Sequence, residues 1–244
     1  MGSDAVLEVP PRSFLSRLFG LYLAPGESFA DIVRRPGFWA PLALMVAVSL
    51  AFSGVWLQKV DPGEFVKGML EESGRWDQIP ADRRGEILET VGRRFPIQVW
   101  VTAAIAPPVI VLLTAAVLLF VFRFFYAGDV NFTKAMSLVA YSLAAVGLVQ
   151  TPLMLLVMAL KGDWNLDPRF ILQANATLLV AKESVAKPLY ALLGSLDVFE
   201  FWTMGLLALG FGLAIRRPLG SALWGVVIPW VVLVALKVGA AALF

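Results

Sequence analysis

The chain has 244 residues, of which 59% are hydrophobic and 16% are charged, whereas a soluble domain is about 45–50% apolar and about 25% charged. This composition excludes an ordinary soluble protein and indicates an integral membrane protein. The formal net charge of +2 is too small to indicate a nucleic-acid partner, and the lack of cysteine and histidine excludes thiol catalysis, disulfides and nearly every zinc site. We therefore expect no cofactor, no metal and no nucleic acid.

The N-terminal region, residues 1–37, is expected to form two short amphipathic helices. The first, in RSFLSRLFGLYL, has Arg12 and Arg17 on its polar face. Its apolar face consists of Phe14, Leu15, Leu18, Phe19 and Tyr22. The second, in ESFADIVRRP, repeats this pattern and is stopped by Pro36. Its apolar face consists of Phe29, Ile32 and Val33. Such helices lie in the headgroup plane of a membrane; the alternative is that they pack on the membrane-spanning helices.

Five later segments are long and apolar enough to cross a bilayer, whose hydrocarbon core of about 30 Å needs about 20 helical residues. They lie at about 38–57, 98–122, 136–160, 198–215 and 220–243. The fold class predicted is an all-α polytopic membrane protein with a five-helix membrane domain over 38–243. An odd number of spans puts the two termini on opposite sides of the membrane.

The orientation is inferred from arginine pairs. The pairs in RRPGFW, before the first span, and in RRP, after the fourth, lie directly at membrane ends, where the positive-inside rule is strongest. The pairs Arg83–Arg84 and Arg93–Arg94 favour the opposite orientation. We place the N-terminus in the cytoplasm and the C-terminus outside; in a prokaryote, the membrane is then the plasma (inner) membrane.

Both long extracytoplasmic loops are expected to be helical. In the first, from Gln58 to Phe95, DPGE begins one helix with Asp61 as its N-cap, and PADRRGEILETVGRRF forms a second short helix. In the second, from Lys161 to Asp197, FILQANATLLVA and PLYALLGSL are predicted to be helices on the membrane surface.

Three stretches of the sequence form a recognisable set of motifs. The stretch LAPGESFADIVRRPGFWAPL contains Pro25, Phe29, Pro36, Trp39 and Pro41. The stretch GDVNFTKAMSLVAYSLAAVGL contains Gly128, Phe132, Tyr141 and Ser142, and the stretch LDVFEFWTMGLLALGF contains Asp197, Phe199, Trp202 and Gly210. At these positions the chain resembles the prokaryotic branch of the Yip (Ypt-interacting protein) domain family, over about residues 14 to 243.

The resemblance implies five spans with a cytoplasmic N-terminus and a role in membrane organisation, trafficking or adaptor function. The expected partners are membrane lipids and proteins bound through the N-terminal region, with a homo-oligomer left open. The acidic Asp-Leu-Tyr-Gly-Pro stretch of the eukaryotic members is absent from this sequence, so their binding to small GTPases of vesicle traffic is not carried over.

The middle of every span lacks Asp, Glu, Lys and Arg, which argues against an enzyme and against ion-coupled transport. Gln150, in the third span, is interpreted as a packing residue that hydrogen-bonds a neighbouring helix; the alternative is a substrate or proton contact. Internal prolines at Pro107, Pro108, Pro152 and Pro229 predict kinks. A cavity between kinked helices would favour the alternative function, a transporter or lipid-handling protein.

The stretch SLDVFEFWTMGLLALGFG begins the fourth span with two acids. Asp197 is predicted to cap the helix at its N-terminus. Glu200 and Lys237 lie at equal distances from the turn between the fourth and fifth spans, so we expect them to form an ion pair that sets the register of this hairpin. The alternative is that each side chain extends separately to the headgroups.

Overall fold

The structure, a computed structural model, describes residues 12–172, 174–180 and 184–243, and no β-strand occurs among them. Its helices are α1 (Phe14–Leu23), α2 (Pro25–Arg34), α3 (Trp39–Leu57), α4 (Pro62–Glu72), η1 (Trp76–Gln78), α5 (Ala81–Phe124), α6 (Phe132–Lys161), α7 (Pro168–Ile171), η2 (Ala176–Leu179), α8 (Lys187–Leu193), α9 (Val198–Ile215) and α10 (Leu219–Leu243). The all-α fold class is confirmed.

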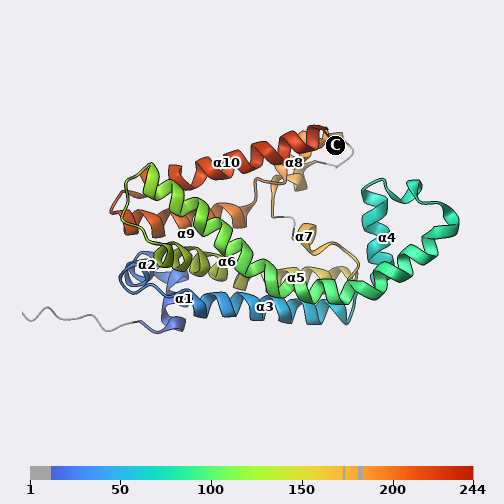
Figure 1. Ribbon diagram of the computed structural model, residues 1–244, viewed down its shortest axis with the longest axis horizontal. Coiled ribbons are helices and arrows are strands. Elements are labelled where there is room, and N and C mark those ends of the chain that lie inside the picture. The colour runs from blue at the N-terminus through green and yellow to red at the C-terminus, as the bar shows by residue number, and fades with distance from the viewer. Residues whose placement is uncertain (1–11, 173, 181–183, 244) are drawn as a thin grey trace, which may run out of the picture.

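Five of these helices, α3, α5, α6, α9 and α10, are long and apolar enough to cross a membrane. They run along the long axis of the molecule (Figure 1). The shortest, α9, has 18 residues and is therefore about 27 Å long, close to the thickness of a bilayer core. Large apolar side chains on α5 and α10, such as Leu113, Phe120, Leu233 and Leu236, are exposed on the bundle, as expected for helices that face lipid.

The buried side chains form two hydrophobic cores. The first joins α1 and α2 to parts of α3, α5, α6, α9 and α10. The second joins the end of α3 to α4, α5, α6 and α7, at the opposite end of the molecule (Figure 1). At its centre, the Trp56 ring lies 5.2 Å from Phe65 and 5.5 Å from Phe95, and the Trp56 indole N–H donates to the Trp164 carbonyl at 2.9 Å.

The first loop differs from the prediction in one respect. Asp61 caps α4 as predicted, but the expected second loop helix is the beginning of α5, a continuous helix of 44 residues. Pro96 lies inside it and removes only one backbone hydrogen bond. The neighbouring side chain of Phe95 is buried in the second core, and this packing stabilises the helix across the proline.

The second loop also differs from the prediction. PLYALLGSL contains α8 as expected, but FILQANATLLVA is not one helix: α7 ends at Ile171 and η2 begins at Ala176. Asn175 explains the break, because its side-chain oxygen accepts a hydrogen bond from the Thr177 N–H at 3.1 Å, an arrangement that competes with helix formation. Positions 173 and 181–183 lie outside the described residues.

Candidate functional site: the groove between the N-terminal helices and α9

The candidate site begins with α1 and α2, which form a helical hairpin. Ser13 caps α1 by accepting a hydrogen bond from the Ser16 N–H at 3.2 Å. Ala24 separates the two helices, and Pro25 begins α2, a position where a proline loses no helical hydrogen bond. The hairpin packs against α6 and α9, at the end of the bundle that also holds the α9–α10 turn (Figure 1).

The hairpin buries one face of each helix in the first core. Leu18 and Phe29 are buried against the bundle, which supports the alternative that these helices pack on the spans; their position in the headgroup plane stays a prediction. Leu15 and Phe19, which belong to the predicted apolar face of α1, are 58% and 57% exposed, so this face is divided between the core and the surface of the bundle. Leu21 is buried instead; its position three residues after Leu18 was the signal that could have identified it.

Ion pairs join α1 to α2 where the sequence predicted only a polar surface. Arg17 Nε lies 2.7 Å from Asp31 Oδ2, and these side chains are only 11% and 5% exposed. Arg17 Nη1 also donates to the Arg35 carbonyl at 3.1 Å. Arg12 pairs with Glu27. The hairpin is therefore closed by charge-assisted hydrogen bonds, and sequence reasoning missed Arg17 and Asp31 because they lie 14 positions apart.

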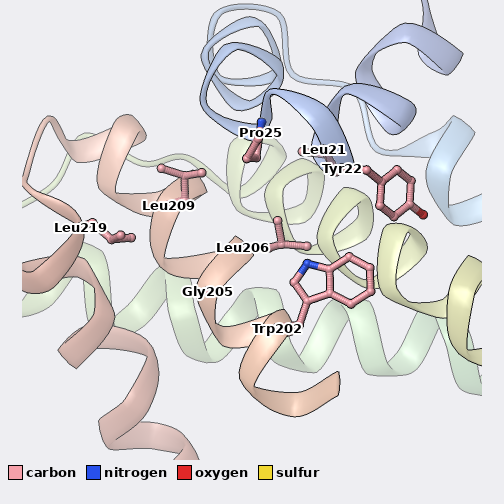
Figure 2. A pocket seen from close by; sticks show the side chains of 8 residues that line it. All are labelled: Leu21, Tyr22, Pro25, Trp202, Gly205, Leu206, Leu209 and Leu219. Atoms are coloured by element: carbon pink, nitrogen blue, oxygen red, sulfur yellow. The ribbon is translucent and has the colours of Figure 1, made fainter. Parts of the chain in front are cut away.

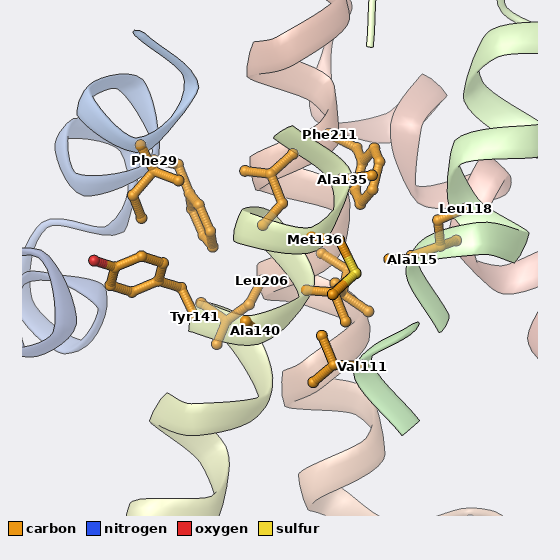
Figure 3. Packing of buried hydrophobic residues seen from close by; sticks show 14 of the residues in the cluster. Phe29, Val111, Ala115, Leu118, Ala135, Met136, Ala140, Tyr141, Leu206 and Phe211 are labelled. Carbon is orange, nitrogen blue, oxygen red and sulfur yellow. The ribbon is translucent and has the colours of Figure 1, made fainter. Parts of the chain in front are cut away.

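Phe29 joins the hairpin to the core of the bundle. It is fully buried and lies in the core beside α6 (Figure 3). A Cβ atom added at Gly210 would lie 3.1 Å from the Phe29 ring and 3.0 Å from Leu138, so glycine at this position of α9 permits the close approach. Two residues of the predicted set, Phe29 and Tyr141, thus lie in the same core.

Aromatic side chains of α1 also contact the bundle, at α6 and α9. Tyr22 donates its hydroxyl hydrogen to the Ala145 carbonyl of α6 at 2.6 Å, and its ring lies 5.9 Å from Trp202 of α9. The Phe14 ring lies 6.0 Å from Tyr141. Burial raises the pKa of the Tyr22 hydroxyl above its ordinary value, which further favours the protonated form that donates this hydrogen bond.

A groove of about 380 Å³ remains between the hairpin and α9 (Figure 2). It is lined by Leu21, Tyr22, Pro25, Trp202, Gly205, Leu206, Leu209 and Leu219. Pro25 and Trp202, both members of the predicted set, face this groove. None of its lining side chains is a nucleophile activated by a base or a metal ligand, so the groove suits an apolar side chain or an acyl chain.

Three other predicted residues lie outside this groove. Pro36 follows the end of α2 and begins the connection to α3. Ser142 is buried, and its hydroxyl donates within α6 to the Leu138 carbonyl at 2.8 Å. Gln150 is half-buried, and among the described residues no hydrogen bond joins its side chain to a neighbouring helix. Its role as a packing residue stays a prediction.

The start of α9 forms a second, separate cluster with α10. Asp197 caps α9 as predicted, since its Oδ1 accepts hydrogen bonds from the Phe199 and Glu200 N–H groups at 2.8 and 3.4 Å. The predicted ion pair between Glu200 and Lys237 is wrong: Lys237 Nζ donates to Ser195 Oγ at 3.1 Å, and no ion pair joins the two charges in the described part of the chain.

The loop before α9 explains this difference. It brings the Ser195 hydroxyl within reach of the lysine, and no local pattern predicts that position. Glu200 and Lys237 nevertheless line one cavity of about 250 Å³, so the structure brings the two side chains to the same region of the hairpin, and their equal depth in the membrane stays a prediction. Among the described residues, no group of three or more acidic side chains is arranged to hold a metal ion.

Comparison with known proteins identifies the family of this chain. A family model described as the Yip1 domain matches residues 19–240. No curated protein and no solved structure has a significant match to the chain. The matched range begins within α1 and ends within α10, and it includes every residue that lines the groove.

Proposed function

This chain belongs to the Yip1 domain family, and we propose that it is a non-enzymatic adaptor with a role in membrane organisation or trafficking. In this role it holds a protein partner at the cytoplasmic surface of its membrane. The proposed partner-binding element is the α1–α2 hairpin with its groove. The proposal rests on one structural feature: the hairpin is closed by a buried ion pair and leaves an apolar face of α1 exposed.

The exposed face of α1 consists of side chains four residues apart. Leu15, Phe19 and Leu23 all point away from the bundle, on the side of α1 opposite the buried Leu18 and Leu21. An apolar stripe with this spacing fits a groove or an amphipathic helix of a partner. The aromatic-lined groove behind α1 adds a pocket for one anchoring side chain.

The hairpin needs no reorganisation to present this face. Its position is set by Phe29 in the core, by the Tyr22 hydrogen bond to α6 and by the Arg17–Asp31 pair. A surface that is already ordered avoids the conformational entropy that a disordered tail would lose on binding. This supports an adaptor whose N-terminal helices act as a rigid binding element.

A photo-crosslinking amino acid placed at Phe19 or at Leu23 tests the proposal in intact cells. We expect the same discrete protein adduct from both positions, because both belong to one exposed stripe. The adduct at Leu23 should disappear with Leu15→Asp, a change on the exposed face that leaves the buried face intact.

Leu113 on α5 provides the matched control, because it is equally exposed on the bundle but lies in the middle of a membrane-spanning helix. It should form no protein adduct. Adducts with lipid alone at Phe19 and Leu23, as at Leu113, would contradict the adaptor role and leave α1 as a membrane anchor.

Lipid handling is the second candidate function. It is supported by one specific observation, the cavity that contains Glu200 and Lys237, together with prolines inside α5, α6 and α10. A lipid-flipping assay with the purified protein in vesicles distinguishes the adaptor function from lipid handling. If the protein is an adaptor, lipids should flip at the same rate in vesicles with the protein as in empty vesicles.

A further inference from the structure

A charged cavity lies where α9 begins and α10 approaches its end, and it shares no lining residue with the groove beside the N-terminal hairpin. Its volume is about 250 Å³. It is lined by Gly194, Ser195, Glu200, Trp230, Leu233, Val234 and Lys237. Two opposite charges, a hydroxyl and an indole therefore meet on otherwise apolar helices.

The charges in this cavity retain most of their bonding capacity. Lys237 uses one of its three N–H donors on Ser195 Oγ at 3.1 Å. Ser195 in turn donates its hydroxyl hydrogen to the Ala191 carbonyl at 2.9 Å. Among the described residues, no donor reaches the Glu200 carboxylate. A ligand can thus bind both charges without displacing an internal ion pair.

The position of the cavity along the helices corresponds to the edge of the membrane. Lys237 is 18 residues after Leu219, at the start of α10, or about 27 Å along the helix. Since a bilayer core is about 30 Å thick, the two charges lie at the level of the headgroups opposite the α9–α10 turn. The neighbouring side chains of Leu233 and Leu236 are exposed on α10, so this side of the cavity faces lipid.

The charges that line the cavity determine which class of lipid headgroup fits it. Asp197 is engaged with the N–H groups at the start of α9, whose partial positive charge offsets it. One ammonium and one carboxylate remain in the cavity. An anionic headgroup would meet repulsion from Glu200, whereas a headgroup with both a phosphate and an ammonium complements both side chains.

We propose that this cavity binds the headgroup of a zwitterionic phospholipid, with its phosphate at Lys237 and its ammonium at Glu200. Phosphatidylethanolamine matches best, because its primary ammonium has N–H groups to donate to the carboxylate. The Trp230 indole provides a flat apolar wall beside the ammonium. This site is independent of the proposed adaptor role.

Native mass spectrometry of the delipidated full-length protein tests the proposal. The protein is titrated with phosphatidylethanolamine, phosphatidylcholine or phosphatidylglycerol of identical acyl chains. The wild-type protein should retain phosphatidylethanolamine in preference to phosphatidylglycerol. Lys237→Gln and Glu200→Gln should each weaken this binding by about tenfold or more, the effect expected from losing a hydrogen bond to a charged group.

Lys161→Gln and Glu72→Gln are the matched controls, because both side chains are exposed charges that do not line the cavity. They should leave the binding unchanged. The exchange of charges in a Glu200→Lys, Lys237→Glu double variant should restore the preference for a zwitterionic lipid. Binding of phosphatidylcholine as well as phosphatidylethanolamine also supports a zwitterionic site.

Two results would overturn the proposal. One is a preference of the wild-type protein for phosphatidylglycerol. This measurement uses no variant, so it does not depend on whether a substituted protein folds. The other is phosphatidylethanolamine binding that is equally strong in the wild type and in both single variants, with native helix content verified by circular dichroism.

Discussion

At the scale of single residues, the Arg17–Asp31 pair is the most sensitive interaction in the N-terminal hairpin. Both side chains are nearly buried and lie 2.7 Å apart, and Arg17 also binds the Arg35 carbonyl that follows α2. In such a setting, removal of one partner leaves the other charge without compensation, which is far more destabilising than losing an exposed pair.

Asp31→Asn is therefore expected to lower the free energy of unfolding by about 3–5 kcal/mol. SDS-induced unfolding of the purified protein in mixed micelles measures this change. The control is Glu89→Gln, which breaks the exposed pair with Arg93 (side chains 72% and 75% exposed) and should change stability by only about 0.5 kcal/mol or less. Equal effects of the two substitutions would show that the hairpin is not held by this pair.

At the scale of elements, α5 is the helix that differs most from its predicted form. The sequence indicated a loop helix and a separate span, whereas the structure has one helix through Pro96. The contact between Phe95 and Trp56 at 5.5 Å shows why: the first part of α5 belongs to the second core and cannot turn away from the span without exposing Phe95.

Pro96→Ala tests this continuity. In an uninterrupted helix, alanine restores the backbone hydrogen bond to the Gly92 carbonyl and removes a steric clash, so the free energy of unfolding should rise by about 1–3 kcal/mol. Pro62→Ala, at the start of α4 where proline is favourable, serves as the control and should not stabilise the protein. A Pro96→Ala variant no more stable than the wild type would indicate a helix that begins at Pro96.

At the scale of the whole molecule, the five long helices and the hairpin give the bundle two different ends. One end holds α1, α2 and the α9–α10 turn, and the other holds α4 and the loop before α9 (Figure 1). Arg34, Arg216 and Arg217 lie exposed at the first end, next to the helix termini where the positive-inside rule applies. We propose that this end is cytoplasmic.

Cysteine labelling in intact cells checks the orientation, because the native chain has no cysteine. An impermeant thiol reagent should label Glu72→Cys and should not label Ser16→Cys or Arg217→Cys until the cells are permeabilised. All three positions are exposed on the bundle. Labelling of Ser16→Cys and Arg217→Cys alone would reverse the orientation, and different labelling of these two positions would contradict the placement of both at one end.

The features that could be predicted from the sequence are those that depend on neighbouring residues. The bounds of α9 were predicted as 198–215, as observed, because hydropathy over about 20 residues is a local property. The cap by Asp197 and the cap by Asp61 were also predicted correctly, since a capping side chain binds backbone groups only two or three positions away.

The contacts between distant segments could not be predicted from the sequence, because they depend on how the whole bundle packs. Lys237 binds Ser195, 42 positions away, rather than Glu200, because the loop before α9 delivers a hydroxyl to it. Tyr22 bonds to Ala145, 123 positions away, and this docking turns a predicted surface helix into part of the first core. Such contacts form when the apolar faces of several helices are buried together. The hydrophobic pattern of one helix shows which of its faces is apolar, but it does not show which other helix covers that face.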